Sequence, residues 1–431
     1  MTQFTFYMLT LGCRVNQYET EFIHSQWEKA GGVECGDMDN AQYICINSCA
    51  VTSNAERESR NAIYRARRSN PEAYIIMTGC AARLFNSFRP RKNAFWAEPD
   101  AIICNKNDLL AGPKGLAENS QDFFPPGILE TSRHSRPVVK AQDGCDRYCA
   151  YCIVPGSRGK PKSRHPQAIL AEISSFLARG WGEVVLSGIN LHLYGKDNEA
   201  YGDFWDLLNF LETALAPSCA GNARIRLSSI DPGLLNGKGL EAIAQSRLLC
   251  PHLHLSIQHG SSGILKKMNR GHYSAAMILD KVGQISSSHG IFGLGADFIA
   301  GFPGETESDF EDLLDLIKNL PLSYAHIFPF SSRPGTRAAK FPNQIPRKVK
   351  NERAAIARKL LEEKRAAFLE SLLKLKNVQI AAEAREAETG KGLNEYYIPC
   401  YFQNFADIDY KLFRARPIKP HKDGLWVEPC D

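Results

Sequence analysis

Residues 144–152 read GCDRYCAYC, and this stretch decides the fold because Cys145, Cys149 and Cys152 have the spacing C-x3-C-x2-C. Three thiolates so close on one loop can bind three irons of a [4Fe–4S] cluster and leave the fourth iron open to another ligand. The alternatives are a zinc loop and a group of unrelated buried thiols. Zinc motifs usually consist of two C-x2-C pairs, so this asymmetric triplet favours an iron–sulfur cluster.

The composition is that of an ordinary globular protein of 431 residues, with 44% hydrophobic and 23% charged side chains. It excludes a fibrous chain or long disorder, and the length suits about two to four domains. No apolar run is long enough for a transmembrane helix, and residues 1–5 do not begin a secretory signal, so we expect a cytoplasmic protein with no membrane contact. Thirteen cysteines in a reducing cytosol indicate metal binding rather than disulfides. The net charge of +5 permits an anionic partner without requiring one.

The hydrophobic pattern predicts an α/β chain with successive domains. Apolar runs alternate with helical patterns in residues 1–117, which predicts an N-terminal parallel βα sheet domain. Six further βα units in residues 137–346 are too few for a closed eight-unit barrel and predict a central partial (β/α)6 barrel. Strand-like runs in residues 377–431 predict a small C-terminal β-barrel. Between these domains we expect a polar linker, residues 118–136, and a basic helix, residues 347–376.

Three cysteines of the first domain are far apart in the sequence but occupy equivalent positions. Cys13, Cys49 and Cys80 each follow the C-terminal end of an apolar strand. The carboxyl ends of parallel strands meet at one edge of a sheet, where ligands bind in α/β folds. Three independent buried cysteines are the simpler interpretation. The equivalent positions favour a shared cluster instead, with Cys104, which also ends an apolar strand, as a rival.

The cysteine loop at 145–152, with an aromatic residue before its last cysteine, resembles the radical S-adenosylmethionine (SAM) enzymes. The resemblance implies that the open iron binds SAM, which an electron from the cluster cleaves to methionine and a 5′-deoxyadenosyl radical. Residues 12–21 (GCRVNQYETE), 47–52 (NSCAVT) and 78–80 (TGC) resemble the N-terminal domain of the methylthiotransferases. That family binds a second [4Fe–4S] cluster on three cysteines and has no ligand at the position of Cys104. The C-terminal barrel is similar to its TRAM domain, which is associated with RNA binding.

The strings at 12–21 and 47–52 are most similar to the MtaB-type subgroup, which installs a 2-methylthio group on N6-threonylcarbamoyladenosine beside the tRNA anticodon. The resemblance implies two uses of SAM: one methylates sulfur at the auxiliary cluster, and one supplies the radical that removes hydrogen from C2 of the adenine. Sister subgroups that act on isopentenyl-adenosine tRNA or on a ribosomal protein are alternatives. A non-catalytic iron–sulfur RNA-binding protein is an alternative of another class, although a structural cluster has little use for an open iron.

The resemblance also implies cofactor contacts and partners. The SAM contacts are expected at strand ends of the second βα series, at Ser187, Gly188, Asn190, Ser229, Gln258 and Asp297. The partners are expected to be tRNA and an electron donor such as a flavodoxin. Two basic stretches, residues 57–68 and 347–376, suit the phosphate backbone, and aromatic residues of the last domain suit base stacking. The aromatic residues in question are Tyr396, Tyr397, Tyr401 and Phe402. The alternative interpretation of the basic stretches is that they are solvated helix faces, and that of the aromatic residues is that they are part of the barrel core.

Overall fold

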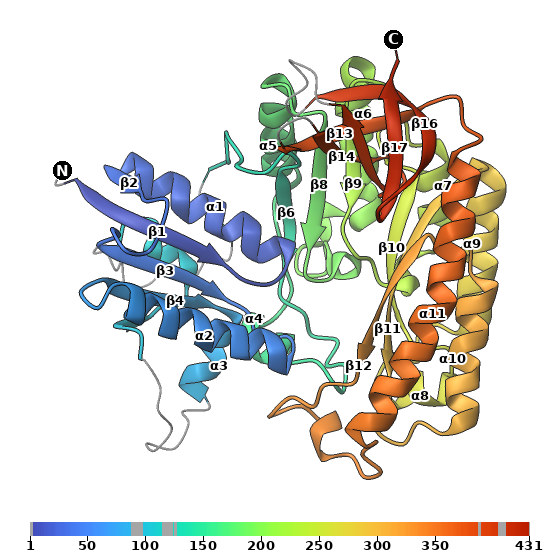
Figure 1. Ribbon diagram of the computed structural model, residues 1–431, viewed down its shortest axis with the longest axis horizontal. Helices are drawn as coiled ribbons and strands as arrows, with labels where there is room; N and C mark the ends of the chain where they lie inside the picture. Colours follow the sequence, from blue (N-terminus) through green and yellow to red (C-terminus); the bar gives the residue numbers. More distant parts are fainter. Residues whose placement is uncertain are drawn as a thin grey trace. The chain divides into compact units, whose positions relative to one another are not determined.

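The computed structural model describes residues 3–87, 98–113, 124, 127–386, 389–403 and 411–430. The chain forms two compact units that are not continuous in sequence (Figure 1). Unit 1 consists of Met1–Leu129, Asp143–Arg164 and Ser331–Ala339. Unit 2 consists of Glu130–Gln142, His165–Phe330 and Lys340–Asp431. Residues 118–123, 125 and 126 of the expected linker lie outside the described residues.

A five-stranded parallel sheet forms the centre of unit 1. In sheet order its strands are β2 (Gly32–Glu34), β1 (Phe4–Thr10), β3 (Tyr43–Ser48), β4 (Tyr74–Gly79) and β5 (Ala101–Ile102). The apolar runs of the sequence predict four of these strands, and each is confirmed within a residue at either end; the predicted bounds are Phe4–Leu11, Gln42–Asn47, Ala73–Thr78 and Ala101–Ile103. The short β2 was not predicted, because three residues are too few to establish a pattern. The other elements of the unit are α1 (Arg14–Lys29), α2 (Ser53–Ser69), α3 (Cys80–Ser87), α4 (Val154–Arg158) and β7 (Lys162–Ser163).

The two faces of this sheet bury different helices, because side chains alternate along a strand. Phe6 and Cys45 pack with Trp27 of α1 on one face. Ile44 packs with Ile63 of α2 on the other face. Each strand is therefore apolar on both faces, which is why these strands appear in the sequence as continuous apolar runs.

Six parallel strands form an open, partial barrel in unit 2, as predicted. In order they are β6 (Val138–Asp143), β8 (Glu183–Gly188), β9 (Arg224–Leu227), β10 (His252–Gln258), β11 (Gly293–Ala300) and β12 (Tyr324–Pro329). An isolated bridge between Ile230 and Leu255 joins β9 to β10, and β12 is an edge strand. The helices between the strands are α5 (Pro166–Ala178), α6 (Phe204–Cys219), α7 (Gly237–Gln245), α8 (Ser262–Lys267), α9 (Ala275–His289) and α10 (Glu307–Asn319).

The C-terminal segment forms a closed β-barrel, drawn in red in Figure 1. Its strands, in barrel order, are β13 (Val378–Glu386), β14 (Thr389–Asn394), β15 (Pro399–Gln403), β17 (Gly424–Pro429) and β16 (Leu412–His421). The preceding helix α11 (Arg347–Leu372) ends four residues earlier than predicted, and its last turn packs Leu369 and Leu372 into the barrel core.

A buried carboxylate ties this barrel to the strands of the partial barrel. Glu183 of β8 accepts hydrogen bonds from Arg224 Nε and Arg226 Nε, each at 2.6 Å. Arg224 Nη1 also donates to the Gln379 carbonyl oxygen at 2.6 Å, and Arg226 Nη2 donates to that of Asn394 at 2.9 Å. Burial alone would raise the pKa of Glu183, but Arg226 and Arg224 outweigh burial and hold it well below its usual range.

Two of the aromatic side chains that suited base stacking are part of the protein interior. Phe402 is 1% exposed and lies in the barrel core. The Tyr397 ring stacks on His252 with a centroid distance of 5.0 Å, and the Arg226 guanidinium lies 5.2 Å from its centroid. The alternative of core aromatics therefore holds for Phe402 and for Tyr401, which is 7% exposed, whereas Tyr397 is partly buried.

Candidate active site

The C-x3-C-x2-C loop is closed tightly on itself within unit 1. Cys145 N–H donates to the Gly159 carbonyl oxygen at 3.0 Å, and Cys152 N–H donates to that of Cys149 at 3.0 Å. Gly144 has a φ of +71°, and a Cβ at this position would overlap the Lys160 carbonyl. Glycine is therefore required where the chain leaves β6. All three thiols of the loop are partly exposed, so they remain accessible to a metal cluster.

The other three candidate cysteines meet at one edge of the parallel sheet. The strand register pairs Thr10 with Asn47 and Ser48 with Gly79, so β1, β3 and β4 end at nearly the same level. A Cβ on Gly12 would lie 2.9 Å from the Cys49 Sγ, which places the Cys13 loop against Cys49. The second predicted triplet thus lies at one edge of this sheet, and its role as a set of cluster ligands stays a prediction.

The helices after these strands favour the thiolate form of the ligands. Cys13 is the N-cap of α1, and Cys80 is the first residue of α3. Helix N-termini carry partial positive charge and stabilise thiolates. Burial raises the pKa of the Cys49 thiol to about 11, and the nearby Cys80 and Cys13 thiols raise it as well. Binding of iron would offset this cost, because a coordinated thiol is deprotonated.

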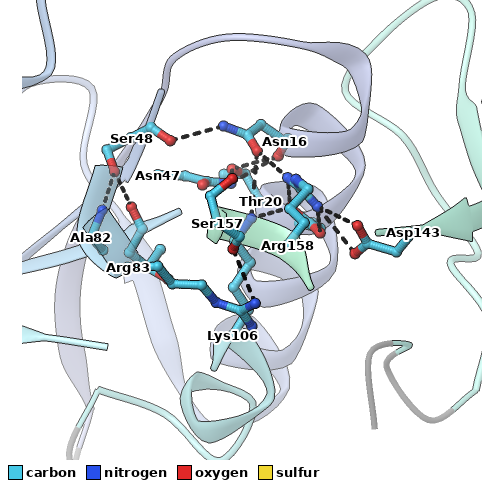
Figure 2. A network of polar contacts seen from close by, with 12 residues as sticks. Asn16, Thr20, Asn47, Ser48, Ala82, Arg83, Lys106, Asp143, Ser157 and Arg158 are labelled. Atoms are coloured by element: carbon cyan, nitrogen blue, oxygen red, sulfur yellow. Dashed lines mark hydrogen bonds and ion pairs between the residues drawn. The ribbon is translucent and has the colours of Figure 1, made fainter. Parts of the chain in front are cut away.

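A buried guanidinium links the two cysteine regions within unit 1 (Figure 2). Arg158, the last residue of α4, donates through Nη1 to Glu19 Oε1 and to Asp143 Oδ1, both at 2.9 Å. Its Nη2 donates to Asn16 Oδ1 at 2.6 Å. Asp143 accepts from Gly144 N–H at 2.7 Å, directly before the cysteine loop. Asn16 and Glu19 belong to α1, the helix that follows Cys13.

The same network fixes the strand ends of the sheet. Asn16 Nδ2 donates to the carbonyl oxygens of Leu11 at 2.7 Å and Ser48 at 3.1 Å. Ser48 Oγ donates to the Thr78 carbonyl oxygen at 2.5 Å, and Asn47 Nδ2 donates to that of Asn16 at 2.9 Å. Figure 2 shows Asn16, Asn47 and Ser48 converging between the strand ends and α1. Each of the three cysteines therefore lies within two residues of a backbone carbonyl that this network holds.

The charges of this network are balanced inside the protein. Burial would lower the pKa of Arg158, but Asp143, Cys80 and Glu19 outweigh burial and raise it above its usual range. Lys106 also pairs with Glu19. Burial lowers the pKa of Lys106, and Glu19 only partly counters that effect. Two cations therefore lie near Cys80, opposite the carboxylates of Glu19 and Asp143.

We expect Arg158→Met to destabilise the protein by about 3–5 kcal/mol, because it would leave Glu19 and Asp143 buried without their main partner. Arg158→Lys should restore only part of this loss, because an ammonium cannot donate to both carboxylates and Asn16 in the geometry of the guanidinium. Urea denaturation measures the change in the free energy of unfolding. A loss below about 1 kcal/mol, typical of an exposed ion pair, would contradict the expectation.

The candidate SAM contacts all lie in unit 2, at or near the C-terminal ends of β8 to β11. Ser187 is buried and Ser229 is exposed. Asn190 N–H donates to Gln142 Oε1 at 2.8 Å, and the Asn190 side chain accepts from His192 N–H. A Cβ on Gly188 would lie 3.0 Å from the Gln142 Cβ, so β6 and β8 pack closely here.

Two other candidates of this group have distinctive local structure. Gln258 is 8% exposed with a φ of +70°, where β10 ends. Asp297 accepts from His254 Nε2 and from His326 Nδ1, each at 3.0 Å. Ligand atoms of these three side chains lie within 4.8 Å of one another, a proximity that the two imidazole–carboxylate hydrogen bonds explain.

The rival cysteine differs from the triplet in its surroundings. Cys104 is two residues beyond the end of β5, and its carbonyl oxygen accepts from Arg83 Nε at 3.0 Å. The structural role of Cys104 stays a prediction. Cys45, Cys250 and Cys400 are buried.

Two family models match the chain. Residues 5–92 match the model described as "Uncharacterized protein family UPF0004", and residues 139–317 match "Radical SAM superfamily". The "Threonylcarbamoyladenosine tRNA methylthiotransferase MtaB" of Aquifex aeolicus is 33% identical over 420 residues, which cover 94% of this chain and 98% of the relative. The protein of the same name from Bacillus subtilis is 30% identical, with 97% and 95% covered. The chain belongs to the radical SAM methylthiotransferases of the MtaB type.

This methylthiotransferase is also similar to a relative with another printed activity and to a solved structure. A "tRNA-2-methylthio-N(6)-dimethylallyladenosine synthase" from Pelotomaculum thermopropionicum is 32% identical, with 89% of this chain and 84% of the relative covered. Among solved structures, the radical SAM methyltransferase TsrM from Kitasatospora setae covers 78% of this chain and 77% of its own, with a TM-score of 0.53 and 12% identity. That likeness shows the fold, and it agrees with the predicted α/β class and partial barrel.

Membership of this family makes the protein a transferase that uses SAM and a [4Fe–4S] cluster, and it favours an enzyme over a non-catalytic iron–sulfur protein. The methylthiotransferase offers a donor set that suits such a cluster, since three partly exposed thiols share one tight loop. None of the helices in the described part of the chain combines the length and the hydropathy needed to cross a bilayer.

Local sequence signals did not reveal Arg158, Asp143 or Lys106. Arg158 and its partner Glu19 are 139 residues apart in the sequence, and buried charges do not form a periodic pattern. The one available signal for Asp143 and Arg158 was their position in the sequence, because Asp143 lies just before the cysteine loop and Arg158 lies after it.

Proposed function

We propose that this methylthiotransferase converts N6-threonylcarbamoyladenosine, next to the tRNA anticodon, into its 2-methylthio derivative. The observation that carries the proposal is the presence of two cysteine triplets in one compact unit, linked by Arg158. The substrate rests on the MtaB relatives, whose printed name gives threonylcarbamoyladenosine tRNA. Replacing the hydrogen on C2 of the adenine by sulfur needs both a radical source and a sulfur carrier, and the two triplets would offer a place for each.

In this proposal the triplets hold different clusters. Cys145, Cys149 and Cys152 would bind a [4Fe–4S] cluster that supplies the SAM-derived radical when reduced. Cys13, Cys49 and Cys80 would bind a second [4Fe–4S] cluster, beside the cations of Lys106 and Arg158. A cluster with three thiolates carries net negative charge, so these buried cations would favour its binding.

The remaining chain would serve SAM and tRNA. Ser187, Gly188, Asn190, Ser229, Gln258 and Asp297 are proposed to contact SAM, at the strand ends where ligands of α/β barrels bind. We assign residues 1–117 to the auxiliary-cluster domain, 137–346 to the radical SAM domain and 377–431 to an RNA-binding domain of TRAM type. The partners would be tRNA and a cytoplasmic electron donor such as a flavodoxin.

Mass spectrometry of tRNA nucleosides from a deletion strain tests the substrate. We expect loss of 2-methylthio-N6-threonylcarbamoyladenosine, accumulation of its precursor and restoration by the gene in trans. An unchanged level of this nucleoside would contradict the proposal. Loss of the 2-methylthio group from dimethylallyladenosine instead would assign the enzyme to the activity printed for the Pelotomaculum relative.

A further inference from the structure

A pocket of about 470 Å³ lies along the edge strand β12 of unit 2. This volume is in the range of small-molecule sites. Its lining contains neither a candidate cluster ligand nor a candidate SAM contact. The lining residues are Ala325, His326, Ile327 and Phe328 of β12 and Arg358 of α11.

Two side chains of β12 give this pocket an aromatic, hydrogen-bonding wall. His326 and Phe328 are two residues apart, so both project from the same face of the strand. The Phe328 residue is 44% exposed, and its ring centroid lies 6.0 Å from that of His326. An exposed ring beside a groove can stack on a flat base, an interaction that contributes substantially to single-strand RNA recognition.

Arg358 adds a positive charge to the lining of the pocket. Its Nη2 donates to the Ile327 carbonyl oxygen at 2.9 Å, which holds the guanidinium against β12. Among the described residues, no carboxylate forms an ion pair with Arg358. The remaining donors of this guanidinium can therefore bind an anionic ligand, and carboxylates and phosphates fit its planar geometry.

The surroundings of His326 favour its charged form. Its Nδ1 donates to Asp297 Oδ1, and this hydrogen bond, aided by the carboxylate's charge, raises the pKa of His326 above its ordinary value. Asp297 is itself held by His254, whose Nδ1 lies 2.9 Å from the Tyr324 hydroxyl. The charged or titratable groups around His326 are thus Asp297, His254, Tyr324 and Arg358. The His326 imidazole, held by Asp297, and the Arg358 guanidinium therefore line the same pocket.

We propose that this pocket binds the N6-threonylcarbamoyl group of the substrate, with its carboxylate between His326 and Arg358 and its flat carbamoyl–adenine system against Phe328. The proposal rests on the proposed function. A dimethylallyl group carries no charge, so the two cations would favour the threonylcarbamoyl substrate over the dimethylallyl one. An RNA phosphate has similar chemistry and is the other source of an anion for the same cations.

Binding of anticodon stem–loops tests the pocket. Fluorescence anisotropy would compare a stem–loop that carries N6-threonylcarbamoyladenosine with one that carries unmodified adenosine. For His326→Gln and for Arg358→Gln we expect the preference for the modified stem–loop to fall about tenfold or more, because each variant loses a hydrogen bond between charged groups. Lys359→Gln is the matched control, since Lys359 is an exposed cation of the same helix outside the pocket lining, and it should leave the preference unchanged.

The wild-type preference should also fall as pH rises through the raised pKa of His326, and this pH dependence should disappear in His326→Gln. If His326→Gln and Arg358→Gln bind both stem–loops more weakly to the same extent, then these cations bind an RNA phosphate. That result would overturn the assignment of the carboxylate to this pocket. An unchanged preference in both variants would overturn the pocket. Failure of the proposed function is distinguishable, because wild-type enzyme would then form no 2-methylthio product from the modified stem–loop.

Discussion

Cys145→Ala should abolish reductive cleavage of SAM, because it removes one of the three thiolates that would hold the cluster. Backbone hydrogen bonds hold this loop in place, from Cys145 N–H to the Gly159 carbonyl oxygen at 3.0 Å and from Ala338 N–H to the Ala150 carbonyl oxygen at 2.7 Å. After anaerobic reconstitution we expect iron to fall from about eight to about four per chain, the content of one [4Fe–4S] cluster. Mass spectrometry of 5′-deoxyadenosine, with dithionite as reductant, measures the activity.

Cys430→Ala is the control for this experiment, because Cys430 is exposed and near the end of the chain, where substitution should cost little. It should keep both the iron content and SAM cleavage. Persistent 5′-deoxyadenosine in Cys145→Ala at the wild-type rate would refute a radical role for the loop.

Cys49→Ala should separate the cleavage of SAM from the formation of the 2-methylthio product. Cys49 lies between β3 and α2, where Cys13 and Cys80 meet it, and it has no role in the loop at 145–152. We expect about four irons per chain to remain. SAM should still be cleaved to 5′-deoxyadenosine, whereas the 2-methylthio product should disappear. Iron analysis and nucleoside mass spectrometry of the same preparation measure both outcomes.

Cys104→Ala tests the rival ligand in the same assays. It should retain about eight irons and form product. If Cys104→Ala loses iron while Cys49→Ala retains it, the auxiliary cluster would be assigned to the wrong cysteines.

The parts of the fold that local sequence determines were predictable. The sequence predicts strands over Glu183–Gly188 and His252–Gln258, and β8 and β10 have these bounds. The strand-like runs that predict the C-terminal barrel, Val378–Ala382, Tyr396–Phe402, Leu412–Ala415 and Leu425–Val427, do not include β14, because Gly390 and Gly392 interrupt any apolar alternation. A Cβ on Gly390 would overlap the Phe402 ring, and one on Gly392 would overlap the Ala381 carbonyl, so packing rather than propensity selects these glycines.

The candidate site was also predictable only in part. Cysteine spacing and strand-end position pointed to both triplets without any structure. The partners of Arg158 and the pairing of Asp297 with His254 and His326 depend on which strands and helices are neighbours in space. Sequence reasoning placed Asp297 at a strand end but gave no indication that two imidazoles surround its carboxylate.

The hydrogen bonds from Arg224 and Arg226 to Gln379 and Asn394 have a consequence for substrate handling. A domain on a flexible linker could bind RNA at variable distances from the rest of the protein. This barrel is instead held against the partial barrel by the hydrogen bonds of Arg224 and Arg226. The span from the barrel surface to the pocket on β12 is therefore a constant of the molecule. In the proposed reaction, the barrel would bind one region of the tRNA and the β12 pocket would bind the target nucleotide. Unit 2 would then select an RNA in which these two parts are separated by the same distance as the two binding surfaces.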